Sequence, residues 1–362
     1  MNNALLAIAS VVAGLLGAGT EEARSQIKSD EEIIFFPTLA VPAADGDTWE
    51  LPIHGWIFER EWENKLVLRW AAQQGVGEDA LTPEQARTLQ ERARWFVLDS
   101  ERSKDIQVRI AGKVAAVGTS EEDGHFQSVV QLTAEELAQA VQTRGALRVV
   151  PFRAIMREGD EREFSGQVVI VQPAGLSIVS DIDDTIKITD VHDRDKLIEN
   201  TFFEPMEAVP GMAAFYRALA ARSPHPDFHY VSASPWQLYQ PLQKFLDDSG
   251  FPAGSVHLRR LGISLANALD GFVVPDDYKE QRIAEIIGAF PERQFMLIGD
   301  ASERDPEAYA ALAKRFPRQV VKIMIRATPG NPPDSPRFEE VFANLPNERW
   351  QVYAEAPNAL VE

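Results

Sequence analysis

The hydrophobic pattern of this chain changes near residue 173, and that change limits the folds open to it. Before that point apolar and polar residues mostly alternate, as in residues 49–56, which is typical of strands with one buried face. After it, short runs that are apolar throughout are separated by helical patterns, which is typical of a parallel sheet covered on both faces. A chain of 362 residues with two such patterns predicts two domains of different architecture.

The first domain is predicted at residues 30–172, as a β-sandwich-like domain with helical insertions. Further strands are expected at residues 106–110, 126–132, 147–156 and 164–171. Helices are expected at residues 62–74, 83–94 and 133–143. Thr133 and Glu136 have the spacing of a capping box, which supports a helix start at that point.

The second domain is predicted at residues 173–330, with an α/β fold built on a Rossmann-like parallel sheet. Its strands are expected at residues 176–180, 228–231, 295–298 and 320–325. Residues 331–362 are treated as a C-terminal extension, rich in Pro, Asn and Glu, with a last apolar patch at residues 350–353.

An uncharged apolar run at residues 4–18 is the candidate targeting segment. It is shorter than the roughly 20 residues that span a bilayer, but it suits the apolar part of a signal peptide. Gly17, Ala18 and Gly19 supply small residues where cleavage is expected, although Met1 to Asn3 include no Lys or Arg. We therefore expect residues 1–19 to direct export to the periplasm or the exterior, with a peripheral membrane anchor or a buried helix in a cytoplasmic protein as alternatives.

Composition excludes several kinds of site and partner. Acidic residues outnumber basic ones 55 to 36, and the formal net charge of -19 repels polyanions, so nucleic acid is not an expected partner. The absence of cysteine excludes disulfides, thiolate zinc sites and a cysteine nucleophile.

An acidic cluster follows the first strand of the second domain: Asp181, Asp183 and Asp184, with Thr185 next to them. Open α/β sheets bind ligands at the carboxyl ends of their strands, where this cluster is predicted to lie. Neighbouring carboxylates repel each other unless a cation or a changed pKa relieves them, and oxygen ligands on a loop suit Mg²⁺. An acidic turn that caps the next helix is the alternative.

Other polar residues follow in a fixed order. Ser232 ends the strand at 228–231, Lys279 precedes a helical run at 282–290, Gly299 and Asp300 end the strand at 295–298, and Asp305 comes five residues later. Taken singly, the serine could be a helix cap, the lysine a solvated charge and the Gly-Asp pair a turn. As an ordered set, these motifs resemble the haloacid dehalogenase superfamily.

The chemistry of these residue types assigns each a role. A carboxylate can attack phosphorus and divide a hydrolysis into two steps, and Asp181 is the expected nucleophile. Asp183, two residues on, can protonate the leaving oxygen and later deprotonate water. Ser232 and Lys279 would neutralise the phosphoryl oxygens. The expected ligands of Mg²⁺ are Asp181, the carbonyl of Asp183, Asp300 and Asp305.

The residues around the motifs narrow the resemblance. The stretches 180–187, 200–202, 209–212, 230–236 and 297–300 resemble the catalytic domain of the actin-patch-associated, Mg²⁺-dependent phosphatidate phosphatases, and residues 54–56 resemble the preceding domain of bacterial relatives. The resemblance implies hydrolysis of phosphatidate to diacylglycerol and phosphate. Peripheral contact to a membrane is a further expectation. Thr185 and Arg259 are the candidate substrate contacts. Ala301 departs from the pattern, where a serine is expected.

Three alternatives stay open. The same chemistry could act on a soluble or protein phosphoester. A phospho-accepting signalling receiver also uses aspartates, a hydroxyl and a lysine, but there the lysine comes last, whereas Lys279 precedes the Gly299-Asp300 strand. An adaptor protein with a silent catalytic half is the third alternative, although all the expected catalytic residues are present.

Overall fold

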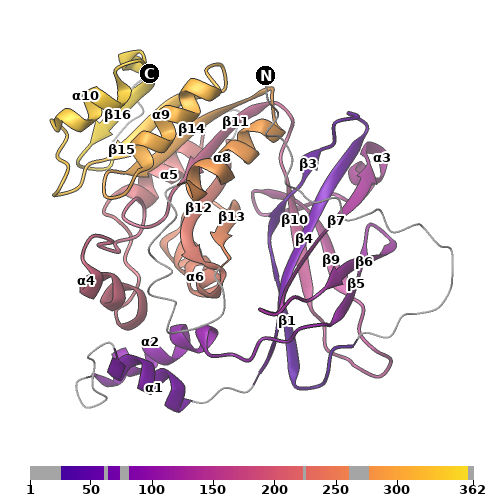
Figure 1. Ribbon diagram of the computed structural model, residues 1–362. Helices are drawn as coiled ribbons and strands as arrows, with labels where there is room; N and C mark the ends of the chain where they lie inside the picture. Colours follow the sequence, from indigo (N-terminus) through magenta and orange to yellow (C-terminus); the bar gives the residue numbers. More distant parts are fainter. Residues whose placement is uncertain (1–25, 61–63, 74–80, 223–225, 261–276, 358–362) are drawn as a thin grey trace.

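The computed structural model describes residues 26–60, 64–73, 81–222, 226–260 and 277–357. The protein is a mixed α/β molecule with three sheets, two in the first half of the chain and one in the second. Figure 1 shows the β-rich half on the right and the α/β half on the left. The predicted signal peptide, residues 1–19, lies outside the described residues. None of the described helices is long and apolar enough to cross a bilayer.

The N-terminal half contains two sheets that share one core. The first joins β1 (Glu31–Phe36), β4 (Thr48–Glu59), β3 (Val41–Pro42) and β7 (His125–Thr133). The second joins β2 (Thr38–Leu39), β10 (Ser165–Ile170), β9 (Leu147–Ala154), β5 (Asp105–Ile110), β6 (Lys113–Thr119) and β8 (Gln142–Arg144). In β5, Ile106, Val108 and Ile110 are buried and their neighbours are more exposed, so the alternation read from the sequence reports a strand with one face in the core.

Three helices interrupt these strands: α1 (Asn64–Gln73), α2 (Pro83–Ala93) and α3 (Ala134–Ala140), and a 3₁₀ turn, η2 (Arg94–Phe96), extends α2. The predicted capping box at α3 is present, because the Thr133 side chain accepts from the backbone of Glu136 and the Glu136 side chain accepts from Thr133. The predicted end of this helix at residue 143 is wrong. Val141 is extended, and residues 142–144 form β8, which pairs with β9, so strand pairing ends the helix early.

The C-terminal half is built on one parallel sheet. Its strands are β11 (Gly175–Ser180), β12 (Asp227–Pro235), β13 (Ser255–Arg259), β14 (Arg293–Asp300), β15 (Val320–Arg326) and β16 (Trp350–Tyr353). The order is β13-β12-β11-β14-β15-β16, and every neighbouring pair is parallel. This is the 3-2-1-4-5-6 order of doubly wound sheets. The apolar patch at residues 350–353 thus supplies the sixth strand, so the C-terminal extension is continuous with this sheet.

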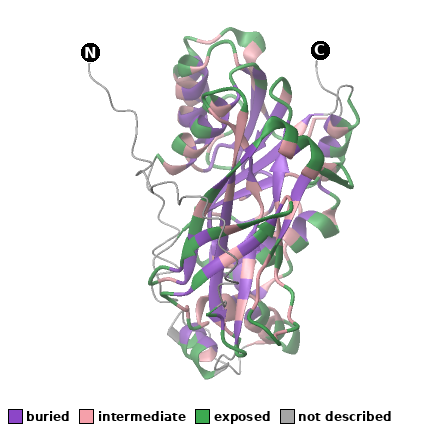
Figure 2. Ribbon diagram, turned by 90° about the vertical axis from the view of Figure 1, so that its right-hand side faces the viewer, coloured by how far each residue is buried: buried purple, intermediate pink, exposed green. Residues whose placement is uncertain are grey.

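Helices cover both faces of the parallel sheet. Ile178 and Val179, adjacent in β11, belong to two different cores. One core contains α5 (Met212–Ala220) and α6 (Tyr239–Ser249), and the other contains α8 (Tyr278–Ala289), α9 (Asp305–Arg315) and α10 (Pro336–Phe342). Figure 2 shows the buried residues concentrated along the strands and the exposed ones on the surrounding elements. Fully apolar strands are therefore explained by burial on both sides.

The two halves of the chain pack against each other beside the carboxyl ends of the sheet. Phe36 of β1 lies 4.4 Å, between ring centroids, from Trp236, which opens the 3₁₀ turn η4 (Trp236–Leu238). Farther along, α1 and α2 pack on α4 (Arg194–Ile198) and the π-helical turn η3 (Glu199–Phe203), and Trp70 contacts the buried Phe202. A last 3₁₀ turn, η6 (Asn347–Arg349), precedes β16.

Candidate active site

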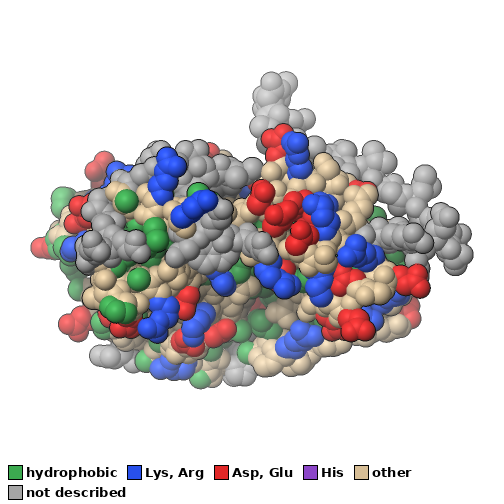
Figure 3. All heavy atoms as spheres, turned by 90° about the horizontal axis from the view of Figure 1, so that it is seen from below, with side chains coloured by type: hydrophobic (Ala, Val, Ile, Leu, Met, Phe, Trp, Pro, Cys, Tyr) green, Lys and Arg blue, Asp and Glu red, His purple; other side chains and the backbone are tan. Residues whose placement is uncertain are grey.

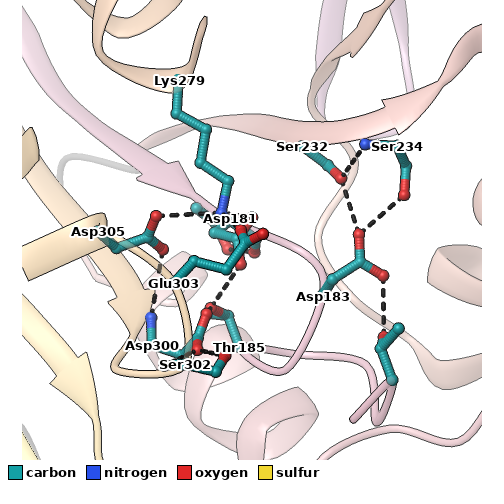
Figure 4. Close-up of polar contacts among 12 residues, drawn as sticks. Asp181, Asp183, Thr185, Ser232, Ser234, Lys279, Asp300, Ser302, Glu303 and Asp305 are labelled. Atoms are coloured by element: carbon teal, nitrogen blue, oxygen red, sulfur yellow. Dashed lines mark hydrogen bonds and ion pairs between the residues drawn. The ribbon is translucent and has the colours of Figure 1, made fainter. Parts of the chain in front are cut away.

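The predicted site residues come from the carboxyl ends of neighbouring strands. Asp181 directly follows β11, Ser232 lies near the end of β12, and Asp300 ends β14. Because β11 pairs with both β12 and β14 in parallel, these ends meet at one edge of the sheet. Figure 4 shows the side chains converging there.

Three carboxyl groups gather in this place. One carboxylate oxygen from each of Asp181, Asp300 and Asp305 lies within 4.8 Å of the others, and all three residues are buried. Lys279, in the first turn of α8, places its Nζ 2.8 Å from Asp181 Oδ1 and 3.0 Å from Asp305 Oδ1. Glu303 Oε2 lies 2.7 Å from the same ammonium. The site thus holds four acidic side chains around one lysine.

Burial and the neighbouring acidic groups together raise the pKa values of these carboxyl groups. Burial raises the pKa of Asp181 well above its usual value, and Asp305 and Asp300 add to the rise, although Lys279 opposes it. Burial and the nearby Asp305 raise the pKa of Asp300 to about 7, and burial also raises the pKa of Asp305. A divalent cation among these oxygens would supply the missing positive charge, so the donor set fits Mg²⁺.

Backbone and hydroxyl groups hold these carboxylates in place. Thr185 Oγ1 donates to Asp181 Oδ2 at 2.8 Å and to Asp300 Oδ2 at 3.3 Å, which puts this candidate substrate contact among the carboxylates. Both the backbone N–H and the hydroxyl of Ser302 donate to Asp300. A Cβ at Gly299 would lie 2.8 Å from the Cβ of Asp305, which explains why glycine precedes Asp300.

Asp183 lies apart from the carboxylate cluster, and hydrogen-bond donors surround its carboxylate. Its Oδ2 accepts from the hydroxyls of Ser232 and Ser234, each at 2.8 Å. Its Oδ1 accepts from Lys187 Nζ at 3.0 Å and from Thr189 Oγ1 at 2.8 Å. Burial alone would raise the pKa of Asp183, but the charge and hydrogen bond of Lys187, with the hydroxyls, lower it below its usual range. Ser232, the predicted phosphoryl contact, is therefore a partner of Asp183 in this structure.

Asp184 organises the loop that carries the motif. Its φ of 54° is left-handed, a conformation in which aspartate is one of the better tolerated residues. Its carboxylate accepts backbone hydrogen bonds from residues 189, 190 and 191, and Arg326 donates to its carbonyl oxygen at 2.6 Å. The third aspartate of the cluster is thus a structural residue of the loop.

The neighbouring residues Arg259 and Arg260 contact different parts of the molecule. Arg259, the candidate substrate contact, ends β13 opposite Pro235 and is 9% exposed, and burial lowers its pKa. Arg260 instead reaches the N-terminal half, where it pairs with Glu121 at 2.8 Å and with Asp123. Only Arg259 therefore stays at the strand end, while Arg260 joins the two halves of the chain.

Four residues of this site were not predicted from the sequence: Lys187, Thr189, Ser302 and Glu303. The first two lie just beyond the acidic cluster, and Ser234 follows Ser232 by two residues on the same strand. Two residues apart on a strand places two side chains on the same face, so both serine hydroxyls reach Asp183. No spacing rule indicates which carboxylate a nearby lysine contacts.

Known proteins resemble the C-terminal half of the chain. Residues 176–327 match the family described as phosphatidate phosphatase APP1, catalytic domain. Phosphatidate phosphatase APP1 of Saccharomyces cerevisiae is 34% identical over 180 residues, which are 49% of this chain and 30% of the yeast protein. An uncharacterized protein of Schizosaccharomyces pombe is 31% identical over 169 residues, which are 46% of this chain and 27% of that protein.

The matched part spans less than a third of either yeast relative. The family match at residues 176–327 extends from β11 to β15 of the sheet that carries the site. Among solved structures, a β-glucuronidase of Parabacteroides merdae aligns with 82% of this chain at 7% identity and a TM-score of 0.26, which is too low to indicate a shared fold. Residues 176–327 of this chain are therefore similar to the catalytic domain of APP1 phosphatidate phosphatase.

Proposed function

We propose that this protein is a Mg²⁺-dependent phosphomonoester hydrolase that converts phosphatidate to diacylglycerol and phosphate through an aspartyl-phosphate on Asp181. The observation that supports it most is the cluster of Asp181, Asp300 and Asp305 around Lys279 at the carboxyl edge of the sheet. A buried carboxylate beside an ammonium and further acidic ligands suits nucleophilic attack on a phosphoryl group.

In the first half-reaction a carboxylate oxygen of Asp181 attacks phosphorus. The bond between phosphorus and the ester oxygen breaks, its electron pair stays on that oxygen, and the oxygen takes a proton from Asp183. Lys279 Nζ, 2.8 Å from Asp181 Oδ1, is placed to neutralise charge on the phosphoryl oxygens. The products of this step are diacylglycerol and the acyl phosphate.

In the second half-reaction water attacks phosphorus and gives a proton to Asp183. The bond between phosphorus and Asp181 breaks, which releases phosphate and restores the carboxylate. The donors around Asp183 favour its ionised form, which is the form that accepts this proton. An incoming phosphoryl anion repels that charge and so favours the protonated form that the first step needs.

Asp181, Asp300 and Asp305 would hold Mg²⁺, with the backbone carbonyl of Asp183 as a further expected ligand. The ion, when bound, supplies positive charge for the phosphoryl oxygens. The raised pKa values of the three carboxyl groups support a cation there.

The lipid substrate is proposed from the resemblance to the yeast phosphatidate phosphatase. A phosphatase of soluble or protein phosphoesters is the second candidate. Figure 3 shows acidic and basic side chains interspersed over one face of the molecule. The large hydrophobic side chains exposed in the described part, Leu66, Val114 and Val129, lie on three different elements, so lipid access is proposed at the site itself.

We also infer a haloacid dehalogenase-like fold for the C-terminal half and a β-sandwich-like fold for the N-terminal half. The parallel order of the sheet and the motif residues at its strand ends support the first. Two sheets around a single core support the second.

The test is Asp181→Asn, which keeps the shape of the side chain and removes the nucleophile. Phosphate release should be measured from phosphatidate vesicles, sugar phosphates and nucleotides, with Mg²⁺ and after chelation. We expect the wild type to act on the vesicles only with Mg²⁺, and the variant to lose at least ~10³-fold in kcat.

Asp248→Asn, at an exposed position on α6, is the matched control and should keep the wild-type rate. Hydrolysis by Asp181→Asn at the wild-type rate would remove Asp181 from the nucleophile role. Release from soluble esters but not from vesicles would replace the lipid by the second candidate.

A further inference from the structure

Lys187 is a buried lysine whose ammonium contacts Asp183, the proposed acid and base of the reaction. The residue is 1% exposed, and its Nζ donates to Asp183 Oδ1 at 3.0 Å and to Thr189 Oγ1 at 2.5 Å. Thr189 Oγ1 in turn donates to the same Asp183 oxygen at 2.8 Å. The three side chains therefore form a closed triangle on one side of the carboxylate.

The backbone fixes the starting point of this long side chain. Lys187 N–H donates to the carbonyl of Ile182 at 3.0 Å, and its carbonyl accepts from Asp184 N–H at 2.7 Å. It also bridges to Ala208, just before α5. A buried lysine stem anchored at its Cα loses little further freedom when the ammonium binds, so the contact with Asp183 is preorganised.

We infer that Lys187 is a positioning residue that, with Thr189, holds the Asp183 carboxylate toward Ser232 and Ser234, where it can reach the leaving oxygen of the substrate. The inference rests on the proposed function. Of the four donors to Asp183, Lys187 alone carries a charge, and charge-assisted hydrogen bonds are shorter and about twice as strong as neutral ones. The hydroxyls can rotate to other acceptors.

A proton donor helps most when the leaving oxygen is a poor leaving group. An alkyl ester such as phosphatidate needs a proton on its oxygen, whereas p-nitrophenolate leaves without one. A misplaced Asp183 should therefore slow the alkyl ester and spare the aryl ester. A lysine that served only the stability of the fold would slow both substrates by the same factor or neither.

The experiment compares kcat on dioctanoyl phosphatidate with kcat on p-nitrophenyl phosphate. For Lys187→Met, which keeps the stem and removes the ammonium, the alkyl rate should fall ~10–100-fold and the aryl rate less than about 3-fold, with KM little changed. Thr189→Val should change the ratio in the same direction by a smaller factor. In an Asp183→Asn background, Lys187→Met should have no further effect.

Lys104→Met is the matched control. Lys104 is also a buried lysine, 8% exposed, and it pairs with Glu31 at 2.6 Å and Glu101 at 3.0 Å in the N-terminal half. Its loss should lower the unfolding temperature and leave the ratio of the two rates unchanged.

A wild-type ratio in Lys187→Met overturns the inference, and so does an equal fall on both substrates or a relative gain on the alkyl ester. If Lys187→Met does not fold, Thr189→Val decides by the same criterion. Crystal structures of the wild type and the folded variant test the positioning of Asp183 without any measurement of activity. If the Asp183 carboxylate has the same position relative to Ser232 and Ser234 in both structures, positioning by Lys187 is contradicted. A wild type that is inactive on both esters contradicts the proposed function alone.

Discussion

Asp181, Asp300 and Asp305 bring three carboxyl groups into a buried space in which Lys279 is the shared ammonium. Each loses its contact with water on folding, which disfavours the charged form. Thr185 and Ser302 contribute hydrogen bonds, but neither adds a charge. The site is therefore short of positive charge, and at the scale of residues this is the property that a bound cation would correct.

From this follows a prediction for metal binding. Mg²⁺ at about 100 times its Kd should stabilise the wild type by about 2.7 kcal/mol, because the ion binds the folded cluster and not the unfolded chain. Asp300→Asn should abolish that gain, since it removes one carboxylate of the set. Thermal unfolding with and without Mg²⁺ measures both.

Asp248→Asn serves as control for this measurement, because Asp248 is exposed and pairs only with Lys244 among the contacts described for it. It should keep the full Mg²⁺ effect. A stabilisation of the same size in Asp300→Asn would place the ion elsewhere.

At the scale of elements, the junction between β14 and α9 decides the shape of the site. Gly299 lets the start of α9 approach the strand, so that Asp305 lies against the backbone and its Oδ2 accepts from Asp300 N–H at 3.3 Å. Tyr309, one turn later, packs on the same glycine. The carboxylates at the two ends of this junction are thereby held together by backbone geometry.

Gly299→Ala tests this junction. The new Cβ would lie 2.8 Å from Asp305 Cβ and from a ring carbon of Tyr309, so α9 must move away. We expect a loss of about 1–3 kcal/mol in stability from overpacking and a fall of ~10-fold or more in kcat. Chemical denaturation and phosphate release measure the two effects.

Gly288→Ala is the matched substitution. Gly288 lies in α8, is exposed, and has no atom near the position of a new Cβ. It should raise stability by up to about 1 kcal/mol and leave the rate unchanged. Equal behaviour of the two alanine variants would refute the importance of the junction.

At the scale of the whole molecule, the N-terminal half is packed against the loops that surround Asp183. Phe36 supports Trp236, which follows the strand of Ser232 and Ser234. On the other side Arg92 of α2 donates to the carbonyl of Thr201 at 2.7 Å, next to the segment that carries Thr189. The β-rich half therefore contributes to the setting of the site, although the family match is confined to residues 176–327.

The interface between the halves contains a buried histidine pair, which predicts a dependence of stability on pH. His54 Nε2 lies 3.0 Å from His125 Nδ1, and burial lowers the pKa of His125 to about 4 and that of His54 well below its usual value. Asp123 opposes the shift at His125 and Arg260 adds to it. Burial also lowers the pKa of His229, to about 3.

In the unfolded chain a histidine binds a proton near pH 6.5. In the folded chain His125 binds a proton only near pH 4. The contribution of His125 to stability is therefore complete above pH 6.5 and falls by on the order of 3 kcal/mol as the pH drops toward 4. His125→Gln should flatten the curve of unfolding free energy against pH, while the exposed His192→Gln should leave it unchanged. A His125→Gln curve as steep as that of the wild type would contradict this account.

The sequence alone predicted that the candidate site residues lie at strand ends, and in the structure Asp181, Ser232 and Asp300 lie there. The apolar runs placed Asp181, Ser232 and Asp300 after strands, and parallel strands bring their carboxyl ends to one edge, so proximity followed from topology. The capping box of α3 was equally local and was confirmed. The predicted end of that helix was wrong, because residues 142–144 form β8, which is stabilised by pairing with β9.

What only the tertiary structure decided is the partner of each charged side chain. By its place in the sequence Lys187 could pair with any of three neighbouring aspartates, and in the folded protein its ammonium contacts Asp183. Arg260 pairs with Asp123, which is 137 residues away in the sequence. Residue type and spacing determine where a side chain starts, but its contacts depend on distances of a few ångströms that long-range packing sets. The sequence thus determined which predicted residues lie at the strand ends, whereas tertiary packing determined the partners of the charged side chains.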